Sequence, residues 1–270
     1  MRITTRNARF QLLTTLGTNR TKRGRAGEFL VQGVRPITLA VEHGWPVRTL
    51  LHEDGRRLSA WAQDVLRATG AESIAMAPDL LAELAEKEPG ATELVAVVAM
   101  PADDLDRIGV GGDFLGVVFD RPTQPGNVGA VVRSADAFGA HGLVVTGHAA
   151  DPYDPKAVRA STGSLFALPV VRAASHREVT AWLAAHRDAG RPVTVVATDE
   201  DGDAAPGDVD LTGPVLLAVG NETAGLSKGW REAADVTVAI PMAGSASSLN
   251  ASNAASIVLY EAHRQRLARD

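Results

Sequence analysis

Six short runs of almost wholly apolar residues in the second half of the chain limit its possible folds more than any other feature. The runs are Phe114–Phe119, Gly142–Thr146, Leu168–Val171, Val193–Ala197, Val215–Val219 and Val236–Ile240. A strand that is apolar throughout needs cover on both faces, which is typical of a parallel sheet between two layers of helices. Helical patterns lie between and after these runs, at Val128–Phe138, Pro155–Thr162, His176–Ala189, Ser227–Ala233 and Leu249–Ala268. We therefore predict an α/β domain with a parallel sheet over residues 113–270.

The first half of the chain predicts a separate, smaller α/β domain over residues 1–107. Short apolar runs and helical patterns alternate from Phe29 to Met100. A chain of 270 residues is long enough for two such domains. Residues 101–112 combine a proline, three aspartates and three glycines, a composition typical of a linker.

Absent and scattered residue types exclude several kinds of chemistry. The chain has no cysteine, which excludes a disulfide scaffold, a thiolate zinc site and a cysteine nucleophile. Its seven histidines lie far apart in the sequence, so we expect no metal. The apolar stretches are far shorter than the roughly 20 residues of a membrane span, and Met1–Gln11 lacks the apolar core of a signal peptide. We expect a cytoplasmic protein with no membrane segment.

Charge is distributed very unevenly along the chain. The first 35 residues carry a formal charge of +7, whereas the whole chain carries −5, so the remainder carries −12. A basic region on an otherwise acidic protein favours a polyanionic partner such as a nucleic acid. A solvated, partly frayed N-terminus would explain the same pattern without any partner.

Three polar, glycine-bearing loops follow predicted strands of the second half, where α/β sheets bind their ligands. They are Asp120–Asp136, Gly220–Ser227 and Pro241–Ser252. Taken singly, each could supply only a helix cap or a tight turn. The sequence has no G-x-G-x-x-G after the first strand of either half and no P-loop. Their absence argues against a dehydrogenase and a P-loop NTPase.

In these loops the sequence resembles the SpoU or TrmH family of RNA ribose 2'-O-methyltransferases, which belong to the SPOUT class. The matching motifs are N-x-G-x-x-x-R at Asn127–Arg133, an apolar strand with G-x-E-x-x-G at Leu216–Gly225, and I-P-M with S-L-N at Ile240–Met242 and Ser248–Asn250. The resemblance implies an N-terminal L30e-like RNA substrate-binding domain and a C-terminal SPOUT domain whose sheet carries a deep trefoil knot. Residues 3–11, 25–51, 100–108 and 241–250 are most similar to a branch of the family that methylates a uridine ribose of 23S rRNA and confers resistance to an orthosomycin such as avilamycin.

The resemblance also assigns roles to individual residues. It implies S-adenosylmethionine (AdoMet) as the methyl donor, held mainly by backbone groups at Thr198, Gly220, Ile240 and Leu249. The catalytic site would comprise Arg133, Asn127, Glu222, Ser248 and Asn250. Arg133 would act either as a phosphate-assisted base or as a charge stabiliser, because an ordinary arginine stays protonated. The expected RNA-binding residues are Arg6, Arg9, Arg20, Lys22, Arg23, Arg25 and Arg35.

The family resemblance further implies a homodimer whose active site draws on both subunits. The last predicted helix supports this, because its apolar residues outnumber those needed to cover one face; they are Leu249, Ala254, Ala255, Ile257, Val258, Leu259 and Ala262. Burial of the helix within its own domain is the alternative. Two other functions stay open at this point: tRNA 2'-O-methylation, and RNA binding without catalysis.

Overall fold

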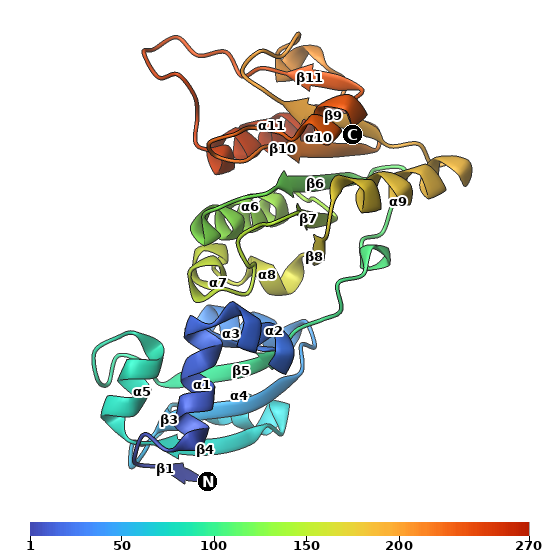
Figure 1. The fold of residues 1–270 in the computed structure, drawn as a ribbon. Helices are drawn as coiled ribbons and strands as arrows, with labels where there is room; N and C mark the ends of the chain where they lie inside the picture. Colours follow the sequence, from blue (N-terminus) through green and yellow to red (C-terminus); the bar gives the residue numbers. More distant parts are fainter. Residues whose placement is uncertain (270) are drawn as a thin grey trace. The chain divides into compact units, whose positions relative to one another are not determined.

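The computed structural model describes residues 1–269 and divides the chain into two compact units (Figure 1). Unit 1 comprises Met1–Pro101 together with Tyr153–Ala167, and unit 2 comprises Ala102–Pro152 together with the chain from Leu168 onward. Each unit is an α/β structure around its own sheet. No helix within residues 1–269 is long and apolar enough to cross a membrane.

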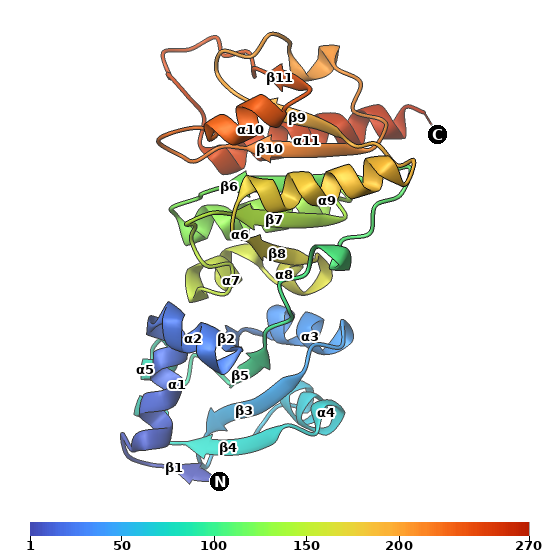
Figure 2. The ribbon, with the colours of Figure 1, turned by 45° about the vertical axis from the view of Figure 1, so that its right-hand side comes forward.

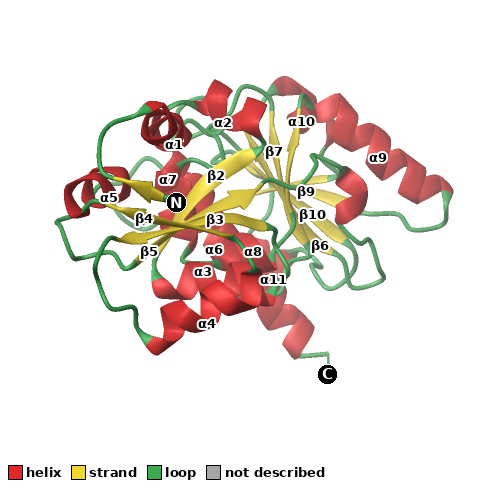
Figure 3. Ribbon diagram, turned by 90° about the horizontal axis from the view of Figure 1, so that it is seen from below, coloured by secondary structure: helices red, strands yellow, loops and turns green. Residues whose placement is uncertain are grey.

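The sheet of unit 1 is mixed and has five strands, seen from below in Figure 3. Its order is β1 (Arg2–Ile3), β4 (Glu72–Met76), β3 (Val47–Glu53), β5 (Leu94–Ala99) and β2 (Glu28–Gln32). Neighbours β1, β4 and β3 are parallel, whereas β5 runs antiparallel to both β3 and β2. The helices of this unit are α1 (Ala8–Thr18), α2 (Arg20–Ala26), α3 (Val34–Glu42), α4 (Ala60–Thr69), α5 (Pro78–Ala85), α7 (Pro155–Ser161) and α8 (Ser164–Ala167).

Helices α1 and α2 are absent from the sequence expectation, which begins its regular elements at Phe29. Asparagine side chains begin both helices: Asn7 Oδ1 accepts a hydrogen bond from the Phe10 amide, and Asn19 Oδ1 accepts one from the Lys22 amide. The apolar face of α1 is narrow, but Phe10, Leu13 and Leu16 are buried in the core of unit 1. The basic N-terminal region is therefore folded rather than frayed.

Residues 153–167 complete an aromatic cluster in unit 1. The ring of Tyr153 lies 4.9 Å from that of Phe29, and Phe166 stacks on Phe29 at 6.2 Å. The Trp45 indole packs edge-on against Phe166 and donates a hydrogen bond to its carbonyl oxygen at 3.0 Å. This segment belongs to the second half of the sequence, and no local pattern indicated its partners.

The sheet of unit 2 is parallel throughout, as the apolar runs predicted. Its order is β11 (Val236–Val238), β9 (Thr194–Thr198), β10 (Val215–Val219), β6 (Leu115–Asp120), β7 (Gly142–Thr146) and β8 (Val170–Ala173). Every residue of β6, β7 and β10 is buried. Figure 2 shows α9 (His176–Asp188) and α10 (Lys228–Ala233) in front of the sheet, with α6 (Pro125–Ala137) and α11 (Ala251–Leu267) behind it.

The segment predicted as a linker packs within unit 2. Its 3₁₀ turn η1 (Leu105–Arg107) precedes two buried residues, Ile108 and Val110. The Asp103 carboxylate accepts hydrogen bonds from the Arg172 amide at 3.0 Å and the Arg172 Nε at 2.9 Å. Composition does not distinguish a free linker from a packed loop, because glycines and acidic residues are common in both.

Two neighbouring side chains of α11 attach its C-terminal end to loops in the rest of unit 2. The Arg266 guanidinium donates hydrogen bonds to the backbone oxygens of Leu211, Asp113, Phe114 and Gly213. The amide of Gln265 bridges the loop after the 3₁₀ turn η2 (Pro206–Asp208): it accepts from the Leu211 amide and donates to the Val209 oxygen. Because no carboxylate pairs with Arg266 among the described residues, desolvation lowers its pKa.

Candidate active site

A pocket of about 590 Å³ lies in unit 2 at the carboxyl ends of three adjacent strands. Thr198 ends β9, Val219 ends β10 and Val238 ends β11, and all three line the pocket. The loops that follow these strands form the remaining walls. This is the position where open parallel sheets bind small ligands.

The pocket brings together residues that lie far apart in the sequence. All four residues expected to hold the methyl donor line it, namely Thr198, Gly220, Ile240 and Leu249. Glu222 and Ser248 line it as well, whereas Asn127, Arg133 and Asn250 do not. Three acids after β9 and one arginine also line the pocket, and sequence reasoning missed them: Asp199, Glu200, Asp201 and Arg231. The acidic run that follows a predicted strand was the available signal.

The Glu222 carboxylate is the most densely hydrogen-bonded group of the site. It accepts from the Thr123 amide at 2.9 Å, the Thr123 hydroxyl at 3.0 Å, the Gln124 amide at 3.3 Å and Asn127 Nδ2 at 2.9 Å. Burial alone would raise its pKa, but the hydrogen bonds outweigh burial and lower the pKa of Glu222 below its usual value. A carboxylate held in this way is poorly suited to accept a proton as a base.

Asn127 and Asn250 extend this network to the start of α11. Asn250 Nδ2 donates to Asn127 Oδ1 at 3.2 Å. Its own Oδ1 accepts from the Ser252 amide at 2.9 Å and the Ser252 hydroxyl at 2.6 Å, which caps the helix. One chain of hydrogen bonds therefore joins the loops of all three sequence motifs.

Arg133 differs from Glu222, Asn127 and Asn250 because its side chain has no polar partner among the described residues. Its side chain is exposed on α6, and no hydrogen bond or ion pair within residues 1–269 involves it. The next residue, Ser134, joins α6 to α11 through a 2.7 Å hydrogen bond to Ser256. The cation is thus available to a ligand that this chain does not supply.

The expected RNA-binding residues fall into three structural groups. Arg6 pairs with Glu83, and this contact raises the pKa of Arg6. Arg9 pairs with Glu72 at 3.1 Å. Arg23 is 1% exposed and donates to the Leu16 oxygen, so its side chain does not face solvent. The remaining four are exposed: Arg20, Lys22, Arg25 and Arg35. The side chains of Lys22, Arg25 and Arg35 have no polar contact within residues 1–269.

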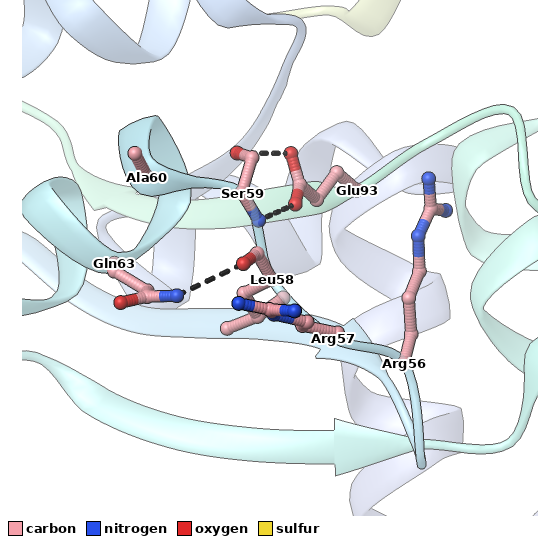
Figure 4. A pocket seen from close by; sticks show the side chains of 7 residues that line it. All are labelled: Arg56, Arg57, Leu58, Ser59, Ala60, Gln63 and Glu93. Atoms are coloured by element: carbon pink, nitrogen blue, oxygen red, sulfur yellow. Dashed lines mark hydrogen bonds between the residues drawn. The ribbon is translucent and has the colours of Figure 1, made fainter.

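A second hollow, of about 520 Å³, lies in unit 1 (Figure 4). The Glu93 carboxylate accepts hydrogen bonds from the Ser59 amide at 2.6 Å and the Ser59 hydroxyl at 2.8 Å, and Gln63 donates to the Leu58 oxygen. These groups satisfy one another and form no constellation of nucleophile and base. Within residues 1–269, no group of three or more His, Cys, Asp or Glu side chains is placed to hold a metal ion.

The parallel sheet, the pocket beyond its strands and the hydrogen-bonded motif loops define an α/β enzyme that binds a small ligand at its sheet edge. Residues 115–260 match the SpoU rRNA methylase family, and residues 7–96 match the SpoU L30e-like domain. The chain belongs to the SpoU rRNA methylase family and is a methyltransferase.

Relatives match this chain over nearly its full length. It is 66% identical over 266 residues to a 23S rRNA (uridine(2479)-2'-O)-methyltransferase of Streptomyces viridochromogenes, covering 98% of this chain and 93% of the relative. The solved structure of the SpoU methyltransferase AviRb from the same organism, in complex with AdoMet, has a TM-score of 0.93 at 65% identity, covering 97% of this chain and 99% of the other. An AdoMet-bound rRNA methyltransferase from Sinorhizobium meliloti has a TM-score of 0.87 at 28% identity, covering 98% and 97%.

We predict that Glu222→Gln lowers the free energy of unfolding by about 1–3 kcal/mol, because the new amide donor would face the donors of Thr123 and Gln124. The lowered pKa means that the wild-type carboxylate contributes stability above its unfolded-state pKa and loses this contribution as pH falls through its folded pKa. Urea unfolding at neutral pH should show the lower stability of the variant, and methyl transfer assays should show its lower activity.

The matched control is Glu232→Gln on α10, where the carboxylate is exposed and, among the described residues, pairs only with Lys228 at 3.5 Å. We expect this change to alter the free energy of unfolding by less than about 0.5 kcal/mol. Equal effects of the two substitutions would contradict the special role of the Glu222 network.

Proposed function

We propose that this methyltransferase transfers a methyl group from AdoMet to the 2'-oxygen of a uridine ribose in 23S rRNA. The observation that carries the proposal is the 66% identity, over 98% of the chain, to an enzyme named for that reaction. Two of the three motif loops line the pocket, and hydrogen bonds of Asn127 join the first motif loop to both of them, which supports the proposal. In the cell we propose that the reaction occurs in the cytoplasm and protects the ribosome from an orthosomycin such as avilamycin.

The pocket of unit 2 is large enough for AdoMet, and backbone groups form part of its wall. Its volume of about 590 Å³ lies within the usual range of small-molecule sites. Gly220 lies so close to the backbone of the following loop that a Cβ there would be 2.4 Å from the Gly225 carbonyl carbon. Backbone groups at Thr198, Gly220, Ile240 and Leu249 would hold AdoMet. When bound, AdoMet supplies an electrophilic methyl group for direct displacement.

The chain's own contribution is to orient the ribose and help its hydroxyl lose a proton. Arg133 has no polar partner in the described part of the chain and would bind the phosphate of the target nucleotide. There it either assists removal of the 2'-proton or stabilises the developing negative charge. Glu222, Asn127 and Asn250 hold the surrounding loops by their mutual hydrogen bonds, and Ser248 lines the pocket beside them.

We predict that Arg133→Ala lowers the rate of methyl transfer at least about 100-fold, the usual scale for loss of proton-transfer or charge stabilisation. AdoMet affinity should stay within about two-fold of wild type, because Arg133 does not line the pocket. Calorimetry with AdoMet and primer-extension detection of 2'-O-methylation measure the two quantities. Arg177→Ala on α9 is the control, and wild-type turnover by Arg133→Ala would refute the assignment.

We further propose that unit 1, which the sequence predicted over residues 1–107 and which also includes Tyr153–Ala167, binds the rRNA. Unit 2, predicted over residues 113–270, would then carry the catalytic site. Three exposed cations of α2 and α3 have side chains with no polar partner in residues 1–269, and these are the best placed to contact phosphates: Lys22, Arg25 and Arg35. Arg6 and Arg9 would first have to leave their carboxylate partners. Arg23 would contribute indirectly, by holding the fold around α2.

We predict that Lys22→Glu combined with Arg25→Glu reduces the slope of log affinity against log salt by about two, since each lost phosphate contact removes about one unit. Filter binding of a 23S rRNA fragment at several salt concentrations measures this slope. The control, Arg177→Glu combined with Arg187→Glu on α9, makes the same change in net charge. Equal slopes for both double variants would show that net charge alone matters.

We also propose that the enzyme is a homodimer with a knotted catalytic domain. Helix α11 buries one apolar face through Ala255, Val258 and Leu259. Large apolar side chains stay exposed elsewhere on it, with Ile257 at 40% and Tyr260 at 54%. A second copy of the same surface would cover them.

We predict that Ile257→Asp converts the dimer to a folded, inactive monomer, because a charge would be placed in an apolar interface. Leu259 is unsuitable for this test, since it is fully buried and its replacement would disturb the fold itself. Light scattering and circular dichroism check mass and folding, and Ala184→Asp on the exposed face of α9 is the control. A fully active wild-type enzyme with the mass of one 28.3 kDa chain would overturn the dimer.

A further inference from the structure

The backbone of Arg121 turns sharply at the carboxyl end of β6. Its φ is +53°, in the left-handed region that favours glycine and is strained for other residues. Its amide still donates to the Thr146 oxygen at 3.0 Å, so the turn begins directly at the carboxyl end of the strand. Strain of this kind persists only where surrounding interactions hold it.

The turn places the Arg121 guanidinium between two distant segments. Nε donates to Asp120 Oδ2 at 3.0 Å, and a terminal nitrogen donates to the Gly225 oxygen at 3.1 Å. Asp120 is 3% exposed and also accepts from the Thr146 hydroxyl at 2.9 Å and the Ser227 amide at 2.8 Å. The buried carboxylate therefore anchors the guanidinium, and the guanidinium reaches the loop after β10.

Asn221 completes the link from the opposite side. Its Nδ2 donates to the Arg121 carbonyl oxygen at 2.6 Å, while its Oδ1 accepts from the amides of Thr223 and Ala224 at 2.8 and 3.0 Å. The backbones of Asn221 and Gly225 also exchange two hydrogen bonds, at 3.0 and 3.1 Å. The turn at residues 221–225 is thus closed within itself and joined to Arg121 at both ends.

Tight packing leaves this arrangement little freedom. A Cβ at Gly220 would lie 2.4 Å from the Leu226 nitrogen, and a Cβ at Gly147 would lie 2.9 Å from Arg121 Cγ. Residues 220–225 all line the pocket, whereas Arg121 does not. Arg121 consequently acts on the pocket only through the loop that it holds.

We propose that Arg121 and Asn221 are positioning residues that fix the backbone of residues 220–225 in the geometry needed to bind AdoMet. This inference rests on the proposed use of that pocket for the methyl donor. Neither guanidinium nor carboxamide takes part in the transfer. Their effect is on the affinity for AdoMet, because a preformed loop loses less conformational entropy when the ligand binds.

The test compares AdoMet affinity in Arg121→Ala, Arg121→Gly and Arg121→Lys with the wild type and with Arg187→Ala on α9. Alanine removes the guanidinium and keeps the backbone strain, whereas glycine removes both. We expect about ten-fold weaker AdoMet binding in both the alanine and the glycine variants, since each loses a charged hydrogen bond to the loop. Lysine, which can reach only one of the two acceptors, should lie between them and the wild type.

Steady-state kinetics separate positioning from catalysis. The KM for AdoMet should rise about ten-fold, while kcat at saturating AdoMet and the affinity for rRNA stay within about two-fold of wild type. Hydrogen exchange should accelerate at residues 221–225 and stay unchanged in β7. Asn221→Asp, which keeps the acceptor for Thr223 and Ala224 but loses the donor to Arg121, should reproduce the weaker binding if Arg121→Ala fails to fold.

Three results would overturn the proposal: wild-type AdoMet affinity in Arg121→Ala and Asn221→Asp, full recovery of affinity in Arg121→Gly, or a fall in kcat with unchanged KM. Recovery by glycine would mean that the backbone turn alone matters. Failure of the wild-type protein to bind AdoMet would instead overturn the proposed function, and calorimetry on the wild type shows this before any variant is made.

Discussion

The Glu222 carboxylate holds the active site together. It lies in the loop after β10, yet three of its four hydrogen bonds come from Thr123 and Gln124 in the loop after β6, and the fourth comes from Asn127 on α6. Asn127 in turn accepts from Asn250 at the start of α11. Neutralising this one group would leave four donors without a charged acceptor, and a hydrogen bond to a charged acceptor is stronger than one to a neutral acceptor. The shape of the pocket therefore depends on an ionised Glu222.

This arrangement separates residues that build the site from residues that are free to act in it. Glu222 and Asn127 have their polar groups engaged with the protein, so their value lies in geometry. Arg133 has no such engagement within residues 1–269 and keeps its charge for a ligand. An unpaired exposed arginine gains most from a phosphate, which can accept two parallel hydrogen bonds. The protein thus combines a rigid pocket for the small donor with a free cation for the polyanionic acceptor.

The sequence was sufficient for features that depend on local pattern. The apolar runs located the strands of unit 2 and their parallel arrangement, because burial on both faces leaves a direct compositional trace. Residues such as Thr198 and Ile240 followed from the family motifs, and the structure places both in one pocket. Arg23 shows the limit of this reasoning. It is a basic residue of α2 like its exposed neighbours, so the sequence does not distinguish it from them. It is nevertheless buried, because its guanidinium faces the Leu16 carbonyl and not the solvent.

Long-range packing accounts for what the sequence could not indicate. Phe29 at the beginning of β2 completes its ring cluster with Tyr153 and Phe166, which follow more than a hundred residues later. Arg23 likewise contacts Asp154, across 131 residues of sequence. Closing so long a loop costs conformational entropy that only tertiary contacts can offset, and no local periodicity records such a contact. The core of unit 1 is therefore complete only when residues 153–167, which lie between β7 and β8 in the sequence, have packed into it. Folding of the N-terminal unit thus depends on a segment from the second half of the chain.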